Sequence, residues 1–187
     1  MRKIIFTLTI FCTTLAYAQT TLVKVNPNKS MIAWHATKVT GEHNGTIQLQ
    51  SGALEMGEQG LTGGKFVVDM STIVNLDLSG EYKANLEGHL KSDDFFSVEK
   101  HPTATLTFKE VTQRANKNVY VVVGDLTIKN ITHPVTFDLE MNEDQAFAKV
   151  VVDRAKYNVR FRSASFFENL GDKLIYDDFE LDVKLNF

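Results

Sequence analysis

Apolar and polar residues alternate along most of the chain between residues 21 and 187. A period of two places the apolar side chains of a run on one face, which is typical of a β-strand buried on one side. The pattern is found in residues 32–36, 66–70, 106–108, 120–128, 135–141, 157–161 and 179–187. It predicts an all-β protein of about eight to ten strands.

Turn residues lie between or beside these runs. Asn44-Gly45 is typical of a two-residue type I′ hairpin turn, and Lys129-Asn130 directly precedes another run. Gly63-Gly64 and residues 116–118 also interrupt adjacent runs. Because hairpins join antiparallel neighbours, we expect a mainly antiparallel sheet.

One segment, residues 79–90, has a helical period instead. Tyr82, Leu86 and Leu90 lie four residues apart, and Asp77 or Ser79 is placed to cap the first turn. The segment leads into a polar turn that ends in the adjacent aromatics Phe95 and Phe96. We expect a single short helix that interrupts the strands.

A sheet with one apolar face buries it against a second sheet or by closing into a barrel. The chain contains 13 Phe, 5 Tyr and 1 Trp, and this bulk favours a barrel with an apolar lining. No internal repeat or Pro/Gly-rich linker divides the sequence, so residues 19–187 form one predicted domain.

Residues 1–18 have the layout of a secretory signal peptide. Arg2 and Lys3 precede an apolar stretch, and Ala16-Tyr17-Ala18 is typical of a cleavage site. Cleavage would remove two positive charges, so the formal net charge of -3 would become -5. It would also remove the only cysteine, Cys12, for which lipid modification is the alternative.

Composition narrows the class of partner and of chemistry. Hydrophobic residues make up 43% and charged residues 23% of the 187 residues, the balance of a globular chain. The negative net charge leaves no basic excess for nucleic acid, so no nucleic-acid partner is expected. The sequence lacks a G-x-S-x-G nucleophile motif and a G-x-G-x-x-G phosphate loop. We predict no catalytic residues, no metal and no cofactor.

A metal-dependent hydrolase is one alternative to that prediction. His89 together with Asp93 or Asp94 could ligate a metal across the end of the predicted helix. The simpler interpretation is a helix-terminal histidine followed by turn carboxylates.

A basic cluster lies between residues 149 and 162. It contains Lys149, Arg154, Lys156, Arg160 and Arg162, and the three arginines share one strand parity. Such a row could hold an anion. The simpler interpretation is the solvent face of an edge strand, where basic residues discourage unwanted pairing.

Two long segments of the sequence resemble the central motifs of the YceI-like polyisoprenoid-binding family. The first comprises residues 88–98 and 101–108, and the second comprises residues 123–137. Residues 28–30 and 152–154 fit the family pattern more loosely. Asn26 and Lys29 depart from it, which puts shared headgroup contacts in doubt. Asn130 replaces a glycine of the family's hairpin turn, and asparagine tolerates the positive φ of that turn.

The resemblance implies a lipocalin-like, extended antiparallel barrel of about eight strands in the bacterial periplasm, and no enzymatic activity. Its elongated cavity would bind a long-chain amphiphile, such as a polyisoprenoid, an isoprenoid quinone or a fatty-acid derivative. The role would be transport, storage or stress protection. A transient membrane contact for ligand exchange and a homodimer are compatible with this function.

We expect three groups of residues at this ligand site, with core packing as the alternative for each. The predicted lining is Trp34, Phe66, Met70, Leu106, Phe108, Leu126, Phe137, Leu139, Tyr157 and Phe161. The residues predicted to close one end are Leu86, Leu90, Phe95 and Phe96. Arg154 and Arg160 are the candidates for a polar or anionic headgroup.

A small outer-membrane barrel is the second alternative. The length suits eight strands, and Leu181, Val183, Leu185 and Phe187 alternate as a closing membrane strand would. Against it, residues 119–123 are apolar on both faces, and the predicted helix breaks the series of hairpins.

Overall fold

The computed structural model describes residues 19–116 and 118–187. The predicted signal peptide at residues 1–18, with Cys12, lies outside the described residues. The strands are β1 (Thr21–Lys24), β2 (Met31–Lys38), β3 (Gly41–Gly57), β4 (Gly60–Asn75), β5 (Thr103–Gln113), β6 (Val119–Ile128), β7 (Ile131–Met141), β8 (Gln145–Asp153) and β9 (Ile175–Asn186). The helix α1 spans Gly80–Lys91, and three 3-10 turns are η1 (Pro27–Lys29), η2 (Arg154–Tyr157) and η3 (Gly171–Lys173).

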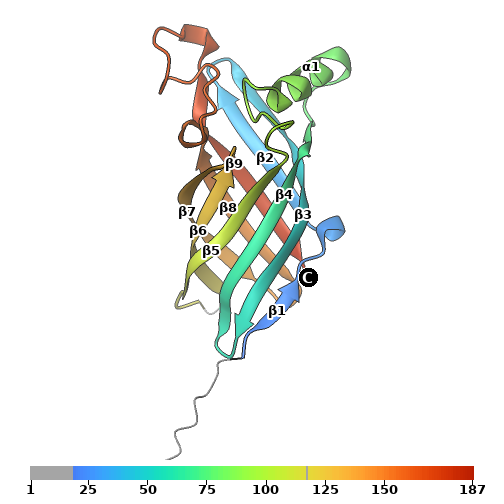
Figure 1. Cartoon of the computed structure of the whole chain (residues 1–187), viewed down its shortest axis with the longest axis vertical. Helices are drawn as coiled ribbons and strands as arrows, with labels where there is room; N and C mark the ends of the chain where they lie inside the picture. The colour runs from blue at the N-terminus through green and yellow to red at the C-terminus, as the bar shows by residue number, and fades with distance from the viewer. Residues whose placement is uncertain (1–18, 117) are drawn as a thin grey trace, which may run out of the picture.

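The strands form one closed antiparallel barrel (Figure 1). The order is β1-β3-β2-β9-β8-β7-β6-β5-β4, and pairing of β3 with β4 closes the ring. β1 and β2 occupy the same position in the barrel, because both pair with β3. β1 pairs with the second half of β3 (Lys24 with Ala53), and β2 pairs with the first half (Ile32 with Ile47). The predicted all-β, antiparallel barrel of about eight strands with one short helix is confirmed.

Strand parity determines what faces the interior. In β6, every second residue from Tyr120 to Ile128 is buried, and the alternate residues lie on the outer side. Leu54, Leu61, Tyr120 and Val122 fill the lower end of the barrel, near the β3–β4 and β5–β6 hairpins. The upper end in Figure 1 is covered by α1, by residues 92–102 and by residues 154–174.

Two of the predicted turns are wrong. Asn44-Gly45 lies inside β3 and Gly63-Gly64 inside β4, whereas the β2–β3 connection is at residues 39–40. Gly45 is required by packing, since a Cβ atom there would lie 1.9 Å from the Val74 carbonyl oxygen and 2.6 Å from the Trp34 ring. A glycine in a strand marks this kind of close approach as well as a turn.

The Lys129-Asn130 turn is confirmed. Both residues have positive φ angles, 52° and 61°, and they connect β6 to β7. Two successive residues of positive φ are what a type I′ hairpin turn requires. The helix is confirmed as well: Ser79 is its N-cap residue, although its side chain makes no capping hydrogen bond.

The predicted strand at residues 157–161 is wrong. The Asp153 carboxylate accepts a hydrogen bond from the Ala155 amide and starts the 3-10 turn η2. Asn158 then takes a left-handed conformation with φ 58°, and Arg162 has φ 52°. These conformations break an extended strand. Arg154, Arg160 and Arg162 therefore do not form a row on one strand face.

Candidate ligand-binding cavity

The inward faces of the strands enclose an elongated cavity of about 190 Å³. Its lining side chains come from β2 to β9 and from the segment that covers the upper end. They are Ile32, Trp34, Ala36, Ile47, Leu49, Phe66, Val68, Met70, Ile73, Leu90, Phe95, Phe96, Ala104, Leu106, Phe108, Leu126, Ile128, Val135, Phe137, Leu139, Ala148, Val150, Arg154, Ile175, Tyr176, Phe179, Leu181, Val183 and Leu185. Almost all of these are hydrocarbon side chains, so the cavity favours an apolar occupant.

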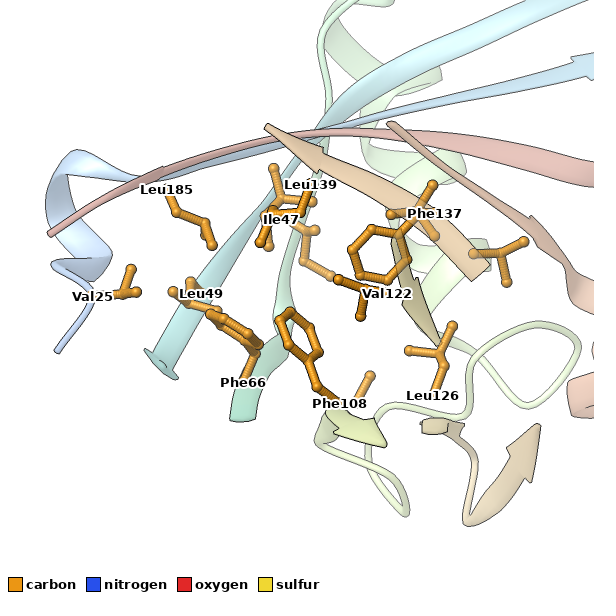
Figure 2. Packing of buried hydrophobic residues seen from close by; sticks show 14 of the residues in the cluster. Val25, Ile47, Leu49, Phe66, Phe108, Val122, Leu126, Phe137, Leu139 and Leu185 are labelled. Atoms are coloured by element: carbon orange, nitrogen blue, oxygen red, sulfur yellow. The ribbon is translucent and has the colours of Figure 1, made fainter. Parts of the chain in front are cut away.

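A cluster of aromatic rings forms the lower part of the cavity. The ring centroids of Phe66 and Phe108 lie 5.4 Å apart, and those of Phe108 and Phe137 lie 5.9 Å apart. Figure 2 shows these rings beside Leu49 and Val122. Tilted and edge-on ring pairs at this separation attract one another beyond the burial of their area. The cluster therefore gives the floor of the cavity a fixed shape.

The polar atom of the single tryptophan does not reach the cavity. Trp34 Nε1 donates a hydrogen bond to the Val74 carbonyl oxygen at 3.2 Å. A buried indole N–H normally needs such a partner, and here the strand β4 provides it. Only the carbon surface of Trp34 remains to contact a ligand.

Residues 92–98 place two phenylalanines at the upper end. The Ser97 amide bonds the Ser92 carbonyl at 2.8 Å, and Ser97 has a left-handed φ of 51°. Asp93 accepts hydrogen bonds from the Ser97 hydroxyl and from Lys100 Nζ, which lower the pKa of its carboxyl group. The tight turn directs Phe95 and Phe96 into the cavity, where Phe96 lies 6.5 Å from the Phe179 ring.

A lysine connects this turn to the opposite side of the upper end. Lys129 Nζ donates to the carbonyl oxygens of Phe95 and Asn158, each at 3.0 Å. Partial burial lowers the pKa of its ammonium group, and the positive charges of Arg160 and Lys100 lower it further. The Asp93 carboxylate partly opposes this shift by raising the pKa. The β6–β7 turn thus holds the two covering segments together.

Helix α1 is fixed to the barrel by a buried amide. Asn75 is fully buried; its amide N–H donates to Glu87 of α1 at 2.8 Å and its side-chain amide donates to the Asn44 carbonyl at 3.0 Å. Asp77 accepts from the Asn44 amide at 2.9 Å and contacts His43 Nδ1 at 2.8 Å. Burial alone would raise the pKa of Asp77, but these hydrogen bonds outweigh it and lower the pKa to about 2. The network explains why Asp77 does not cap α1.

Arg154 is a structural clamp. Its guanidinium donates to the carbonyl oxygens of Val159, Phe161, Ile175 and Tyr176 at 2.9–3.1 Å. Nη2 also lies 3.3 Å from the Asp177 carboxylate. Burial lowers the pKa of Arg154, and the neighbouring carboxylates oppose that shift. Although the side chain borders the cavity, its N–H groups are already directed at the protein, so a headgroup would have to displace these bonds.

The structure brings most of the other predicted site residues to the cavity. Trp34, Phe66, Met70, Leu90, Phe95, Phe96, Leu106, Phe108, Leu126, Phe137 and Leu139 all line it. That they contact a ligand stays a prediction.

Four predicted residues lie elsewhere. Leu86 is half-buried on α1, and Tyr157 is buried beneath the His133 ring at 5.5 Å, where burial raises its pKa to about 12. The Phe161 ring packs on His89 at 4.4 Å, behind Phe95. Arg160 is exposed, with Nε bonded to Asn158 Oδ1 at 2.5 Å. For the three residues after Asp153 the reason is the 3-10 turn η2, which ends the strand and removes strand parity.

More than half of the lining residues are not among those predicted from the sequence. Ile32 and Ala36 flank Trp34 on the same face of β2, and Phe179, Leu181, Val183 and Leu185 form the inner face of β9. The alternation of these runs is visible in the sequence. A prediction that included every residue on the apolar face of each run, and not only the bulkiest ones, would have contained them.

Only one of the two proposed metal pairs, His89 with Asp94, is in contact. His89 Nε2 lies 3.1 Å from Asp94 Oδ2. The Asp93 carboxylate instead accepts a hydrogen bond from the Ser97 hydroxyl and pairs with Lys100. In the part of the chain that the structure describes, no three His, Cys, Asp or Glu side chains gather as a metal site would require. The geometry therefore gives no support to the hydrolase alternative.

The outer face of the barrel carries cross-strand ion pairs. Lys149 Nζ lies 2.8 Å from Glu180 Oε2, and Arg114 Nη2 lies 2.8 Å from Asp138 Oδ1. An outer-membrane barrel has the reverse arrangement, with an apolar band outside and a polar interior. Within residues 19–116 and 118–187, no helix is both long and apolar enough to cross a bilayer.

Relatives with similar sequences come from several bacteria. The chain is 38% identical over 101 residues to a UPF0312 protein of Staphylococcus epidermidis, an alignment that covers 48% of this chain and 54% of the relative. It is 36% identical over 97 residues to a UPF0312 protein of Photorhabdus laumondii, covering 52% of this chain and 47% of the relative. The chain thus spans about half the length of the curated relatives it matches.

Solved structures share the fold at low sequence identity. BcnA of Burkholderia cenocepacia superposes with a TM-score of 0.66 at 18% identity, over 86% of this chain and 98% of that protein. A polyisoprenoid binding domain of Saccharophagus degradans gives a TM-score of 0.57 at 12% identity, over 90% and 97%. The profile of the YceI-like domain matches residues 23–187, which is nearly the whole described barrel. The chain therefore belongs to the YceI-like family.

Proposed function

We propose that this protein binds a long-chain apolar lipid, with a polyisoprenoid as the first candidate, and that it acts without catalysis. The observation that carries the proposal is the hydrocarbon lining of the barrel cavity. The name of the S. degradans relative supports the ligand class, because it describes that domain as polyisoprenoid-binding. An isoprenoid quinone and a fatty-acid derivative share the same chemistry and remain within the proposal.

The binding energy would come from removing the lipid chain from water. Each buried CH₂ group contributes about 0.8 kcal/mol, so ten to fifteen such groups contribute roughly 8 to 12 kcal/mol before the entropy of association is subtracted. Each further CH₂ group that the cavity buries therefore tightens binding about fourfold. Since the lining offers few free polar groups, a headgroup would stay at the upper end.

The ligand's headgroup would lie beside Tyr176. This residue lines the cavity and is still 49% exposed, so it marks where the cavity reaches solvent. A polar group placed there keeps its hydration, whereas deeper in the barrel it would lose hydrogen bonds to water without replacement.

We also propose that the chain is exported to the periplasm and cleaved after Ala18. The sequence of residues 1–18 supports this part of the proposal. Intact-mass measurement of the protein from osmotic-shock fluid should give a chain that begins at Gln19. Recovery of the uncleaved chain in the cytoplasm would contradict export.

The decisive test of the function is mass spectrometry of an organic extract from protein purified without detergent. We expect one dominant lipid class in amounts comparable to the protein. The lipid should disappear from a variant whose cavity is filled. Repeated absence of any lipid, together with no uptake of prenyl or acyl probes, would refute the proposal.

A further inference from the structure

Large apolar side chains are exposed around the upper end of the barrel. Val39, Phe166, Phe167 and Tyr176 are 45%, 38%, 48% and 49% exposed, and we call these four residues the rim surface. Leu76 and Tyr82 are exposed on the α1 side of the same end. Single exposed apolar residues are ordinary, but a group of them at one end of a molecule marks a contact surface.

The rim surface is held together by backbone hydrogen bonds. The Val39 amide bonds the Leu174 carbonyl at 3.1 Å, and the Ile175 amide bonds the Arg162 carbonyl at 3.0 Å. The β2–β3 turn, the start of β9 and the loop before it are therefore neighbours (Figure 1). The four apolar side chains consequently belong to one continuous region.

The exposure of the two phenylalanines is imposed by the fold of their loop. The Phe166 and Phe167 amides both bond the Ser163 carbonyl, at 3.1 Å and 3.0 Å, and Ser163 is fully buried. The Ser165 hydroxyl donates to the Asp177 carboxylate at 2.7 Å. The loop is thus anchored through its small polar residues, while its bulky apolar residues point outward.

Cations accompany these aromatic rings. The Arg160 guanidinium lies 4.7 Å from the centre of the Phe166 ring, and that of Arg162 lies 4.9 Å from the Phe161 ring. With Lys173, the loop at residues 158–174 has three cations against the two acids Glu168 and Asp172, a net charge of +1 in a chain of net charge -3. The loop is therefore the part of this face that an anionic surface attracts.

The rim surface is continuous with the cavity. Tyr176 belongs to both, since it lines the cavity and is half exposed. A lipid that leaves a bilayer at this surface could enter the barrel without crossing water, which would otherwise cost the full hydration of its chain.

We propose that the rim surface docks on a bilayer containing anionic phospholipid, with Phe166 and Phe167 inserted at the interface and Arg160 and Arg162 against lipid phosphates. This inference rests on the proposed function, because docking is useful only if the cavity takes up a lipid from the bilayer. Aromatic side chains with flanking arginines suit the interface between headgroups and acyl chains. One loop with two phenylalanines provides weak, reversible binding, which suits exchange.

Flotation with vesicles tests the docking directly. The protein is mixed with vesicles of phosphatidylethanolamine and phosphatidylglycerol, or of phosphatidylcholine alone. We expect Phe166→Ser with Phe167→Ser to lower the partition coefficient at least tenfold on both kinds of vesicle. Arg160→Gln with Arg162→Gln should lower it about tenfold on the anionic vesicles only.

Leu22→Ser with Met31→Ser provides the matched control. These side chains are 64% and 52% exposed but lie in β1 and at the start of β2, away from the rim surface. The control should partition like the wild type. Equal partitioning of the control and the Phe166/Phe167 variant, both shown to be folded by thermal unfolding, would overturn the inference.

Two further readouts separate the possible occupants and the two proposals. A concentration-dependent dimer that is lost in the Phe166/Phe167 variant, without binding of the wild type to vesicles, would assign the rim surface to a second copy and overturn the inference. A fluorescent acyl probe delivered from ethanol measures cavity binding without vesicles. Failure of probe uptake counts against the proposed function alone, and we expect the Phe166/Phe167 variant to take up the probe normally.

Discussion

Gly45 illustrates how one missing side chain determines the packing of the upper barrel. The Val74 carbonyl and the Trp34 ring occupy the space where a Cβ atom would stand, at 1.9 Å and 2.6 Å. Backbone cannot yield to such an overlap as a flexible side chain does. We expect Gly45→Ala to lower the free energy of unfolding by about 3 kcal/mol or more, measured by urea denaturation.

Gly88 is the matched control for that substitution. It lies in α1, and beyond its chain neighbours and the backbone of that helix no atom is within 4 Å of the position of a Cβ atom. Because alanine favours a helix over glycine, Gly88→Ala should stabilise the protein by about 0.5 to 1 kcal/mol. Similar destabilisation by both substitutions would show that the close contact at Gly45 is not the cause.

Asp77 makes the stability of the upper end depend on acid pH. Its pKa falls from 3.8 to about 2 on folding, so the folded protein holds the charged form more tightly than the unfolded chain. The stabilisation is complete above pH 4 and is lost as the pH falls towards 2. A shift of this size corresponds to about 2 kcal/mol.

We therefore expect Asp77→Asn to destabilise the protein by about 2 kcal/mol at pH 7 and to flatten the pH dependence between 4 and 2. Chemical denaturation at a series of pH values measures both effects. Asp138→Asn is the control, since that carboxylate is 52% exposed in its pair with Arg114 and should contribute less than about 1 kcal/mol. An unchanged slope in the Asp77 variant would contradict the assignment.

The sequence could not reveal these residue-scale roles. Asn44-Gly45 carries a strong local turn signal, but the partners that override it, Trp34 and Val74, come from other strands. Asp77 is a plausible cap for α1 by position, yet its carboxylate bonds the Asn44 amide and His43 on the neighbouring strand β3. The turn prediction failed, and Ser79 instead of Asp77 is the N-cap residue of α1, because the deciding contacts are long-range.

At the scale of elements, the loop that follows β8 depends on Arg154 for its conformation. The guanidinium fixes both ends of residues 159–176 through four carbonyl oxygens. A lysine ammonium cannot reproduce a planar fork of five donors. We expect Arg154→Lys to cost about 3 kcal/mol of unfolding free energy and to reduce hydrogen-exchange protection of the Ile175 amide.

Arg114→Lys is the control for this prediction. Arg114 is 52% exposed and pairs with Asp138 on the outer face, so its replacement should change stability by less than about 1 kcal/mol. Retained protection of the Ile175 amide in the Arg154 variant would mean that the loop is held by other contacts.

At the scale of elements, periodicity predicted the strands well and one segment badly. Residues 120–128 and 179–187 alternate because one face is buried, and both are strands. Residues 157–161 alternate in the same way, but Asp153 starts a turn and Asn158 reverses the backbone. Arg154 was consequently assigned to a headgroup, when its partners are the carbonyls of the loop itself.

The barrel as a whole could be anticipated from composition, but its closure could not. The excess of aromatic residues favoured an apolar lining, and the resemblance to a family supplied the topology. Pairing of β2 with β9 joins segments about 150 residues apart in sequence, such as Met31 with Lys184, which no local pattern specifies. Strand parity, left open by the sequence, follows once the strand pairings are known.

The same parity provides the sharpest test of where a lipid binds. Ala104 and Thr103 are neighbours in β5, but Ala104 is buried and lines the cavity whereas Thr103 is exposed. Ala104→Phe would place a ring inside the cavity of about 190 Å³ and should weaken binding of an acyl probe at least tenfold. Thr103→Phe adds the same ring outside and should leave the affinity unchanged. Because overpacking costs about 1 to 3 kcal/mol, thermal unfolding must show that both variants are folded. Equal affinities in two folded variants would place the lipid outside the barrel, since no chain could enter a filled cavity as readily as an empty one.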